Sequence, residues 1–250
     1  MQFDLDTYPS VKLLAQQLEK VSGKPALIVM DSSLGDMLST QITARTPGQP
    51  AHVVKVNSKY HALRHALASV QLRFILRRYQ IQSPLKDVGL APGAVDIISE
   101  QLKNVEQIPA GQLPDIAHSI AGNLIVQLRS ALPTVAVHHE LQKYQSELCD
   151  QQQEAIKITI NNNLQSLKET IFPAQLVRWN RLLAATESFG LASLIKNKPL
   201  MVPFESLGLL EPAKEIAGPL LLGEYDGLDD LELVEITASK IKMTELHQWI

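Results

Sequence analysis

The stretch "AHVVKVNSKYHALRHALASVQLRFILRRY", residues 51–79, decides the fold that we expect for this chain. Val53, Val54 and Val56 are β-branched residues, which favour a strand, and Asn57 and Ser58 close it. The residues that follow, up to Tyr79, include neither Gly nor Pro, so we expect them to be helical. A strand therefore leads directly into a long helix.

The expected helix over 61–79 carries apolar side chains on two sides, because successive residues on a helix are roughly 100° apart. One stripe consists of Leu63, Leu67, Val70 and Phe74, and the other, almost opposite, consists of His61, His65, Ala68, Leu72, Leu76 and Tyr79. A helix that is apolar on two sides is buried between layers. We therefore place this helix between an N-terminal sheet and the C-terminal helices.

The segments before it complete a small α+β arrangement. Residues 8–23 place Val11, Leu13, Leu14 and Leu18 at helical spacing and end at Gly23, a common helix terminator. Two further strands are expected, one within "KPALIVMD" (24–31) and one from about Ser39 to Thr46. The order over the first 80 residues is then helix, three strands and helix.

From about Pro92 onward, apolar residues recur three and four apart, which predicts a mainly helical region. Six prolines interrupt these helical runs, and we expect them to lie near helix starts or in connectors; they are Pro109, Pro114, Pro133, Pro173, Pro199 and Pro203. The predicted class is α+β, predominantly α. A three-stranded sheet and helix core spans 1–85 and a helical C-terminal region spans 86–250. No flexible linker separates them, so we expect one continuous body.

Composition favours a soluble, cytoplasmic protein. The net charge of −3 and the pI near 6.2 give no global basic field that would attract nucleic acid or an anionic membrane. Cys149 is the one cysteine, so no internal disulfide forms, as is typical of a reducing compartment. The first residues do not have the pattern of a signal peptide, and we expect no membrane-spanning segment.

His61 and His65 have the spacing of the two metal ligands in a zincin helix, H-E-x-x-H, in which the glutamate activates water. Ala62 stands at the glutamate position, so the general base is missing. A third ligand would come from elsewhere, and the candidates are Asp115, His118, His138, His139 and Glu140. Our preferred interpretation is a structural pair of histidines without a cofactor, and a zinc site at His61 and His65 is the alternative.

The order of elements resembles the N-terminal core of the ImmA/IrrE-type metallopeptidases, small bacterial zincins. In that family a phrase such as "I-x-V-N" precedes a metal helix that reads approximately "A-H-E-x-G-H-x-L", and "VVKVNS" occupies the matching strand end here. One register takes His61 to His65 as the metal motif. The other takes "ASVQLRFIL", 68–76, and puts Ser69, Val70 and Arg73 at the His, Glu and His positions. The resemblance covers roughly residues 8–80 and implies a peptidase core without its general base.

Three functions from different classes follow from these patterns. We favour a catalytically inactive, metallopeptidase-like protein that binds a protein or peptide partner or acts as a regulatory module. One alternative is a metal-dependent hydrolase, a peptidase, that uses His61 and His65. The other is a nucleic-acid-binding accessory protein in which Arg73, Arg77 and Arg78 grip phosphates, although salt bridges to nearby carboxylates are the favoured interpretation of these arginines. We expect no membrane partner, and nothing in the sequence sets the oligomeric state.

Overall fold

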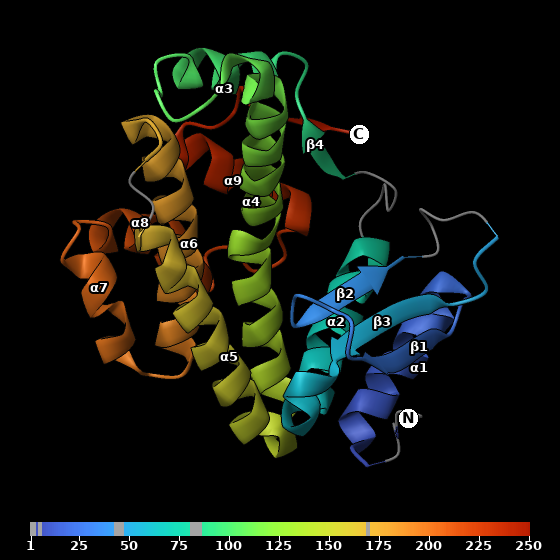
Figure 1. Ribbon diagram of the computed structural model, residues 1–250. Coiled ribbons are helices and arrows are strands. Elements are labelled where there is room, and N and C mark those ends of the chain that lie inside the picture. Colours follow the sequence, from blue (N-terminus) through green and yellow to red (C-terminus); the bar gives the residue numbers. More distant parts are fainter. Residues whose placement is uncertain (1–3, 5–6, 43–47, 81–86, 169–170) are drawn as a thin grey trace. The chain divides into compact units, whose positions relative to one another are not determined.

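The computed structural model describes residues 4, 7–42, 48–80, 87–168 and 171–250. It is 68% helical with 9% strand, which confirms the α+β, predominantly α class. The chain divides into two compact units, the first comprising Met1–Leu85 with Val137–Lys157 and the second Lys86–Ala136 with Ile158–Ile250. Figure 1 shows the elements of both. Residues 137–157 thus belong with the N-terminal part, whereas the sequence had placed all of 86–250 in the helical region.

The first unit contains the helix, three strands and helix expected from the sequence. Its N-terminal elements are α1 (Pro9–Ser22), β1 (Ala26–Asp31), β2 (Leu38–Gln41), β3 (His52–Asn57), the 3₁₀ helix η2 (Ser58–Leu63) and α2 (Arg64–Gln80). The strand order is β1-β3-β2, with β1 parallel and β2 antiparallel to β3. The strand expected over 39–46 is present as β2 up to Gln41, and residues 43–46 of the expected range lie outside the described residues.

Helix α1 begins and ends where its sequence predicts. Pro9 occupies the first turn, where its missing N–H is not needed. Gly23 ends the helix at φ 70°, and its N–H donates to the carbonyl of Glu19. Three of the four expected apolar residues are buried, but Leu13 is 55% exposed, because it lies about 100° away from Leu14 around the helix.

Helix α2 lies at the centre of the first unit, as the two apolar stripes predicted. It packs against α1 and β3. The alternating burial of β3 shows that one face of the sheet is covered. The core joins apolar side chains from the sheet, both helices and the 137–157 segment; it comprises Val11, Leu14, Leu18, Ile28, Val54, Val56, Leu67, Leu72, Ile75, Leu76, Val137, Leu141 and Leu148, among others.

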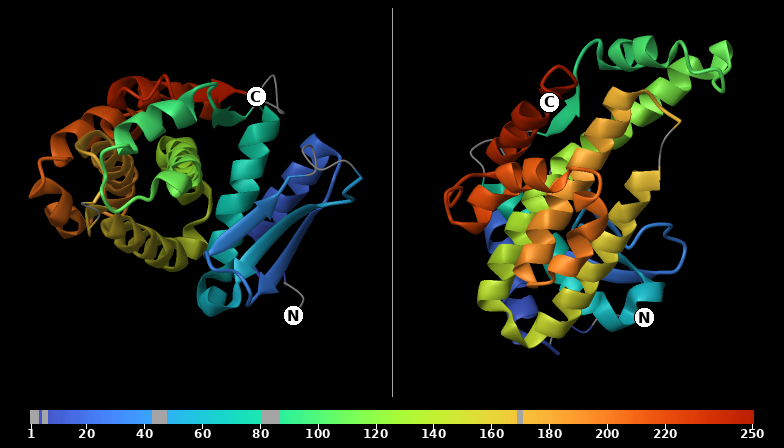
Figure 2. Two further views of the ribbon diagram at one scale, coloured as in Figure 1. Left: turned by 45° about the horizontal axis from the view of Figure 1, so that its top comes forward. Right: turned by 90° about the vertical axis from the view of Figure 1, so that its left-hand side faces the viewer.

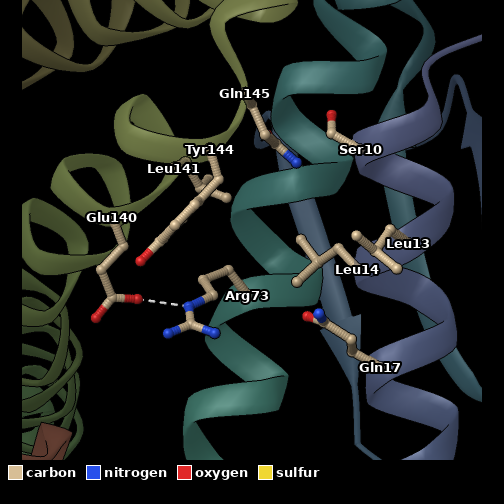
Figure 3. A pocket seen from close by; sticks show the side chains of 9 residues that line it. All are labelled: Ser10, Leu13, Leu14, Gln17, Arg73, Glu140, Leu141, Tyr144 and Gln145. Atoms are coloured by element: carbon tan, nitrogen blue, oxygen red, sulfur yellow. Dashed lines mark hydrogen bonds and ion pairs between the residues drawn. The ribbon is translucent and has the colours of Figure 1, made fainter.

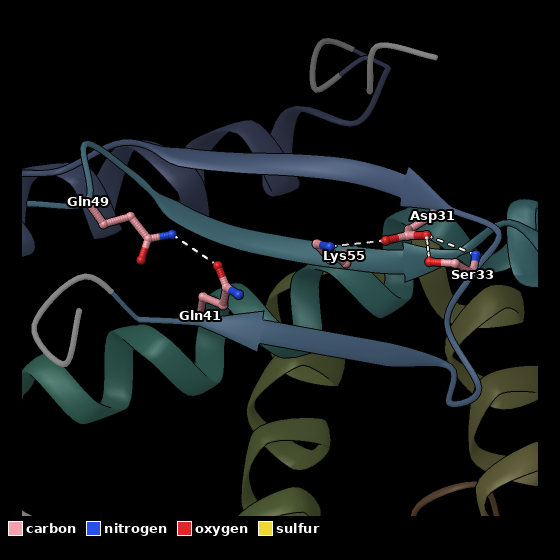
Figure 4. A network of polar contacts seen from close by, with 5 residues as sticks. All are labelled: Asp31, Ser33, Gln41, Gln49 and Lys55. Atoms are coloured by element: carbon pink, nitrogen blue, oxygen red, sulfur yellow. Dashed lines mark hydrogen bonds and ion pairs between the residues drawn. The ribbon is translucent and has the colours of Figure 1, made fainter.

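Polar side chains fix the ends of β1 and β3. Asn57 accepts a hydrogen bond from the Lys59 N–H and donates to the carbonyls of Leu34 and Asp36, so it ties the strand end to the preceding loop. Asp31 accepts from the hydroxyl and N–H of Ser33 and pairs with Lys55 across the parallel strands (Figure 4). These bonds, those from Ser33 first, lower the pKa of Asp31 to about 2.

The second unit is helical apart from a two-stranded sheet. Its elements are β4 (Val88–Leu90), α3 (Ala94–Leu102), η3 (Ala110–Gln112), α4 (Leu113–Tyr144, here up to 136), α5 (Cys149–Asn163, here from 158), η5 (Leu164–Lys168), α6 (Ala174–Leu194), η6 (Lys198–Met201), α7 (Val202–Glu205), α8 (Leu210–Leu221), α9 (Asp230–Ile241) and β5 (His247–Trp249). Helix α6 is mostly buried and packs along α8 (Figure 2). The 3₁₀ helix η4 (Ser146–Leu148) belongs to the first unit.

Two features of the second unit differ from the sequence-based expectation. Pro133 lies inside α4, which runs without interruption from Leu113 to Tyr144, and not at a helix start or in a connector. Pro133 sits among buried residues, so packing outweighs the lost backbone hydrogen bond, roughly 3 kcal/mol in an exposed helix. The C-terminal residues also form a strand, β5, antiparallel to β4.

Within the part of the chain that the structure describes, one helix is long and apolar enough to cross a bilayer, whereas the sequence predicted no membrane-spanning segment. It spans Ala110–Tyr144, which is α4 with the turn before it. Of its most apolar window, 56% is buried inside the protein. Buried core helices of similar length and composition meet the same criterion, so α4 is only weak evidence for a membrane span.

Candidate functional site: a groove in the first unit

The two histidines of the zincin-like spacing do not share a helix face. His61 is exposed in η2, before α2 begins, and Tyr60 next to it has non-helical φ and ψ angles. His65 is 1% exposed in the first turn of α2, where its ring lies 4.6 Å from the ring of Tyr8 and its Nε2 is 3.2 Å from the Asp4 carbonyl. Burial lowers the pKa of His65.

No group of three or more His, Cys, Asp or Glu side chains that could hold a metal ion occurs in the described parts of the chain. Among the candidate third ligands, Asp115 and His118 belong to the second unit. His138 is buried, which lowers its pKa to about 4. His139, its neighbour in α4, already makes an interaction within the protein. Glu140 pairs with arginine side chains.

Arg73 and Arg77 on α2 share one carboxylate at the end of α4. The Nε of Arg73 lies 2.5 Å from one oxygen of Glu140, and Arg77 bonds the other oxygen through a terminal nitrogen. This is the salt bridge that the sequence favoured for the arginines. Arg78 is 3% exposed. A contact of these three arginines with nucleic acid stays a prediction.

A groove opens beside this ion pair, with a volume of about 310 Å³ (Figure 3). It is lined by α1, by Arg73 of α2 and by the last residues of α4, all of which belong to the first unit. The lining residues are Ser10, Leu13, Leu14, Gln17, Arg73, Glu140, Leu141, Tyr144 and Gln145. We refer to this surface as the α1–α4 groove.

The apolar part of the α1–α4 groove has a buried floor and an exposed rim. Leu14 and Leu141 are buried and belong to the core of the unit. Leu13 is exposed on one side, and Tyr144, 75% exposed, stands on the other. Large exposed apolar side chains over a buried apolar floor are typical of a surface that contacts another molecule.

Two polar side chains of the groove, Gln145 and Arg73, are bonded to other residues of the first unit. Gln145 is buried and its Oε1 accepts a weak hydrogen bond, 3.4 Å, from Gln152. The guanidinium of Arg73 is held through Nε by Glu140, and its two terminal nitrogens make no bond to the other lining residues in Figure 3. A guanidinium that is fixed in this way and lines a groove is suited to a carboxylate or a peptide carbonyl.

Comparison with protein-family models, with curated proteins and with solved structures gave no match.

Sequence reasoning singled out Arg73 and Glu140 but missed the other important residues of the groove. Leu13 was assigned to the buried face of its helix, and Tyr144 and Gln145 are ordinary residues at a helix end. The groove exists because residues 137–157 fold back onto α1 and α2. A long-range contact of this kind leaves no local pattern in the sequence.

Proposed function

We propose that this chain is a non-catalytic, metallopeptidase-like protein and that its first unit binds a protein partner through the α1–α4 groove. The observation that carries the proposal is the exposed pair Leu13 and Tyr144 above the buried floor of Leu14 and Leu141. Water contact with such a surface is unfavourable, and a partner's apolar side chain would relieve it.

The non-catalytic part of the proposal rests on residues of the ImmA/IrrE-like core. Ala62 has no carboxylate with which to take a proton from water. His61 and His65 differ in exposure, one facing solvent and the other packed on Tyr8. Two ligands of one metal ion need a common direction. These features support a binding role for the core in place of hydrolysis.

The groove also suggests which chemistry the partner offers. Its size suits one or two apolar side chains of a peptide segment between Leu13 and Tyr144. Arg73 would hold a backbone carbonyl or an acidic side chain of the same segment. A short segment with an apolar residue next to an acidic one is therefore the expected ligand.

Peptide selection tests this proposal. A library of random peptides displayed on phage is selected against the full chain, and the affinity of the tightest peptide is measured by fluorescence anisotropy. Tyrosine is enriched among the interface residues whose truncation costs about 2 kcal/mol or more, so Tyr144→Ala should weaken binding by at least about tenfold. Leu13→Ala should weaken binding in the same direction.

Val202→Ala is the matched control, because Val202 is a comparably exposed apolar residue in the second unit. It should leave the affinity unchanged. Failure to select any peptide would contradict the proposal. So would a peptide that binds Tyr144→Ala as tightly as the wild type.

A further inference from the structure

A second pocket, with a volume of about 230 Å³, lies within the second unit between α4, η5 and α6. Its wall carries four carboxamide side chains, Asn123 and Gln127 from α4, Gln165 from η5 and Asn180 from α6. Ser166 and Phe172 complete one side, and aliphatic residues of α4 and α6 form the rest. We refer to this surface as the amide pocket.

The composition of the amide pocket selects against charged ligands. None of the described residues that line it carries a charge. A carboxylate or phosphate would gain no counter-ion from these residues in return for the hydration that it gives up. Carboxamides instead offer one donor group and one acceptor group each, so they match a neutral ligand that has both.

The side chain of Gln127 is an independent observation that favours a neutral ligand with a donor and an acceptor group. Its Oε1 is buried and has no hydrogen-bond partner among the described residues. A buried carbonyl oxygen without a partner is unfavourable. Gln127 lines the pocket, and a half-turn about χ3 exchanges the oxygen and nitrogen of its carboxamide. A ligand that offers both an N–H and a C=O can therefore bond this carboxamide in either orientation.

The remaining surface sets the size and shape of the ligand. The pocket is smaller than the roughly 300 Å³ from which pockets for drug-sized ligands begin, so the ligand is a small molecule or one group of a larger one. Phe172 and the aliphatic residues provide an apolar surface beside the amides. A flat apolar body fits against such a surface.

We propose that the amide pocket binds a small uncharged ligand with an amide edge, an N–H beside a C=O, on a compact body. Two common sources present this edge, the cyclic amide of a pyrimidine base and the acetamido group of an N-acetylated sugar. Both would pair with Gln127 and Asn180, and the apolar wall favours the flat base over the sugar.

Uridine and N-acetylglucosamine are the probes. Each is titrated into the full chain up to about 10 mM, which detects millimolar and tighter binding, and is followed by amide chemical shifts in NMR spectra. We expect uridine to bind and 3-methyluridine, which lacks the N–H, to bind at least about tenfold more weakly. Saturable binding of N-acetylglucosamine alone would assign the pocket to the sugar and keep the amide edge.

Two variants test whether the ligand binds in the amide pocket. Gln127→Met keeps the length of the side chain but removes the amide, and it should weaken binding by at least about tenfold. Because Gln127 Oε1 has no partner among the described residues, the variant should be at least as stable as the wild type in thermal unfolding. Gln175→Met is the control, an exposed glutamine of α6 outside the pocket.

Three results would overturn the proposal. In the first, neither uridine nor N-acetylglucosamine binds. In the second, uridine and 3-methyluridine bind equally well and the sugar does not bind. In the third, the Gln127→Met variant folds and binds the ligand with unchanged affinity. Asn180→Leu, on the neighbouring helix, provides the same test if Gln127→Met does not fold.

Discussion

His65 and His61 are four residues apart, yet their surroundings predict different effects when each is replaced. His65→Ala removes a buried ring that contacts Tyr8 and should lower the free energy of unfolding by about 1–3 kcal/mol. His61→Ala alters an exposed residue and should change it by less than about 0.5 kcal/mol. Urea unfolding of the two single variants measures the difference. Equal losses in both variants, abolished by a zinc chelator, would indicate a shared metal.

Because His138 is buried, we expect the free energy of unfolding of the first unit to decrease in acid. Its Nδ1 is buried without a hydrogen-bond partner among the described residues, and burial lowers its pKa from 6.5 to about 4. Between these pH values the unfolded chain binds a proton that the folded chain does not. The contribution of His138 to the free energy of unfolding is therefore fully present above pH 6.5. It decreases by roughly 3 kcal/mol in total as the pH falls towards 4.

Urea unfolding at a series of pH values measures this effect. His138→Leu should flatten the decrease between pH 6.5 and 4. His118→Leu, at an exposed position, should leave the decrease unchanged. A steep decrease that persists in His138→Leu would assign the acid sensitivity to other groups.

At the residue scale, the sequence predicts which residues end a helix or strand better than it predicts which side chains are exposed. Gly23 and Asn57 have the predicted roles, because Gly23 ends α1 and Asn57 accepts the N–H of Lys59 at the end of β3. The exposure of Leu13 and the burial of His138 depend on elements far away in the sequence. Helical spacing alone places Leu13 beside Leu14 and cannot tell which of the two faces the core.

At the scale of elements, the contact between α4 and α6 depends on a glycine. A Cβ built on Gly190 would lie 2.5 Å from a methyl group of Val135, closer than real Cβ contacts. Gly190→Ala should therefore destabilise the second unit by about 1–3 kcal/mol, despite the better helix propensity of alanine. Thermal or urea unfolding measures this loss.

The double variant Val135→Ala/Gly190→Ala tests the cause. If the clash is responsible, the double variant should lose less free energy of unfolding than the two single variants lose together, by about 1 kcal/mol or more. Gly122→Ala is the control, because a Cβ on this helical glycine meets nothing within 4 Å. It should be neutral or stabilising by up to about 1 kcal/mol. Additive effects of the two substitutions would show that the contact is not the reason.

The elements that the sequence predicts well are those with a strong local pattern. The helix at 9–22 has both the periodicity and the end signals that such predictions use, and the helix at 64–80 has buried residues at helical spacing. Strand β5 was missed because three residues are too few for a periodic pattern, and its pairing with β4 joins opposite ends of the second unit's sequence. Pro133 misled the prediction because a proline usually ends a helix.

At the scale of the whole molecule, the chain enters the first unit twice. Residues 137–157 are far in sequence from the rest of the first unit, and they contribute Val137, Leu141 and Leu148 to the core around α2. The sequence gives no composition change at 136 or 157, because both points fall inside helices α4 and α5. For this reason the return of the chain to the first unit, and the groove that it forms, could not be predicted from the sequence.

The central claim of the proposed function is that the first unit acts without a metal at His61 and His65. The most direct test is the zinc content of the full chain, purified without a metal-binding tag, by elemental mass spectrometry. We expect the same zinc content, far below one ion per chain, in the wild type and in the double variant His61→Ala/His65→Ala. About one zinc ion per wild-type chain that disappears in the double variant would contradict the claim.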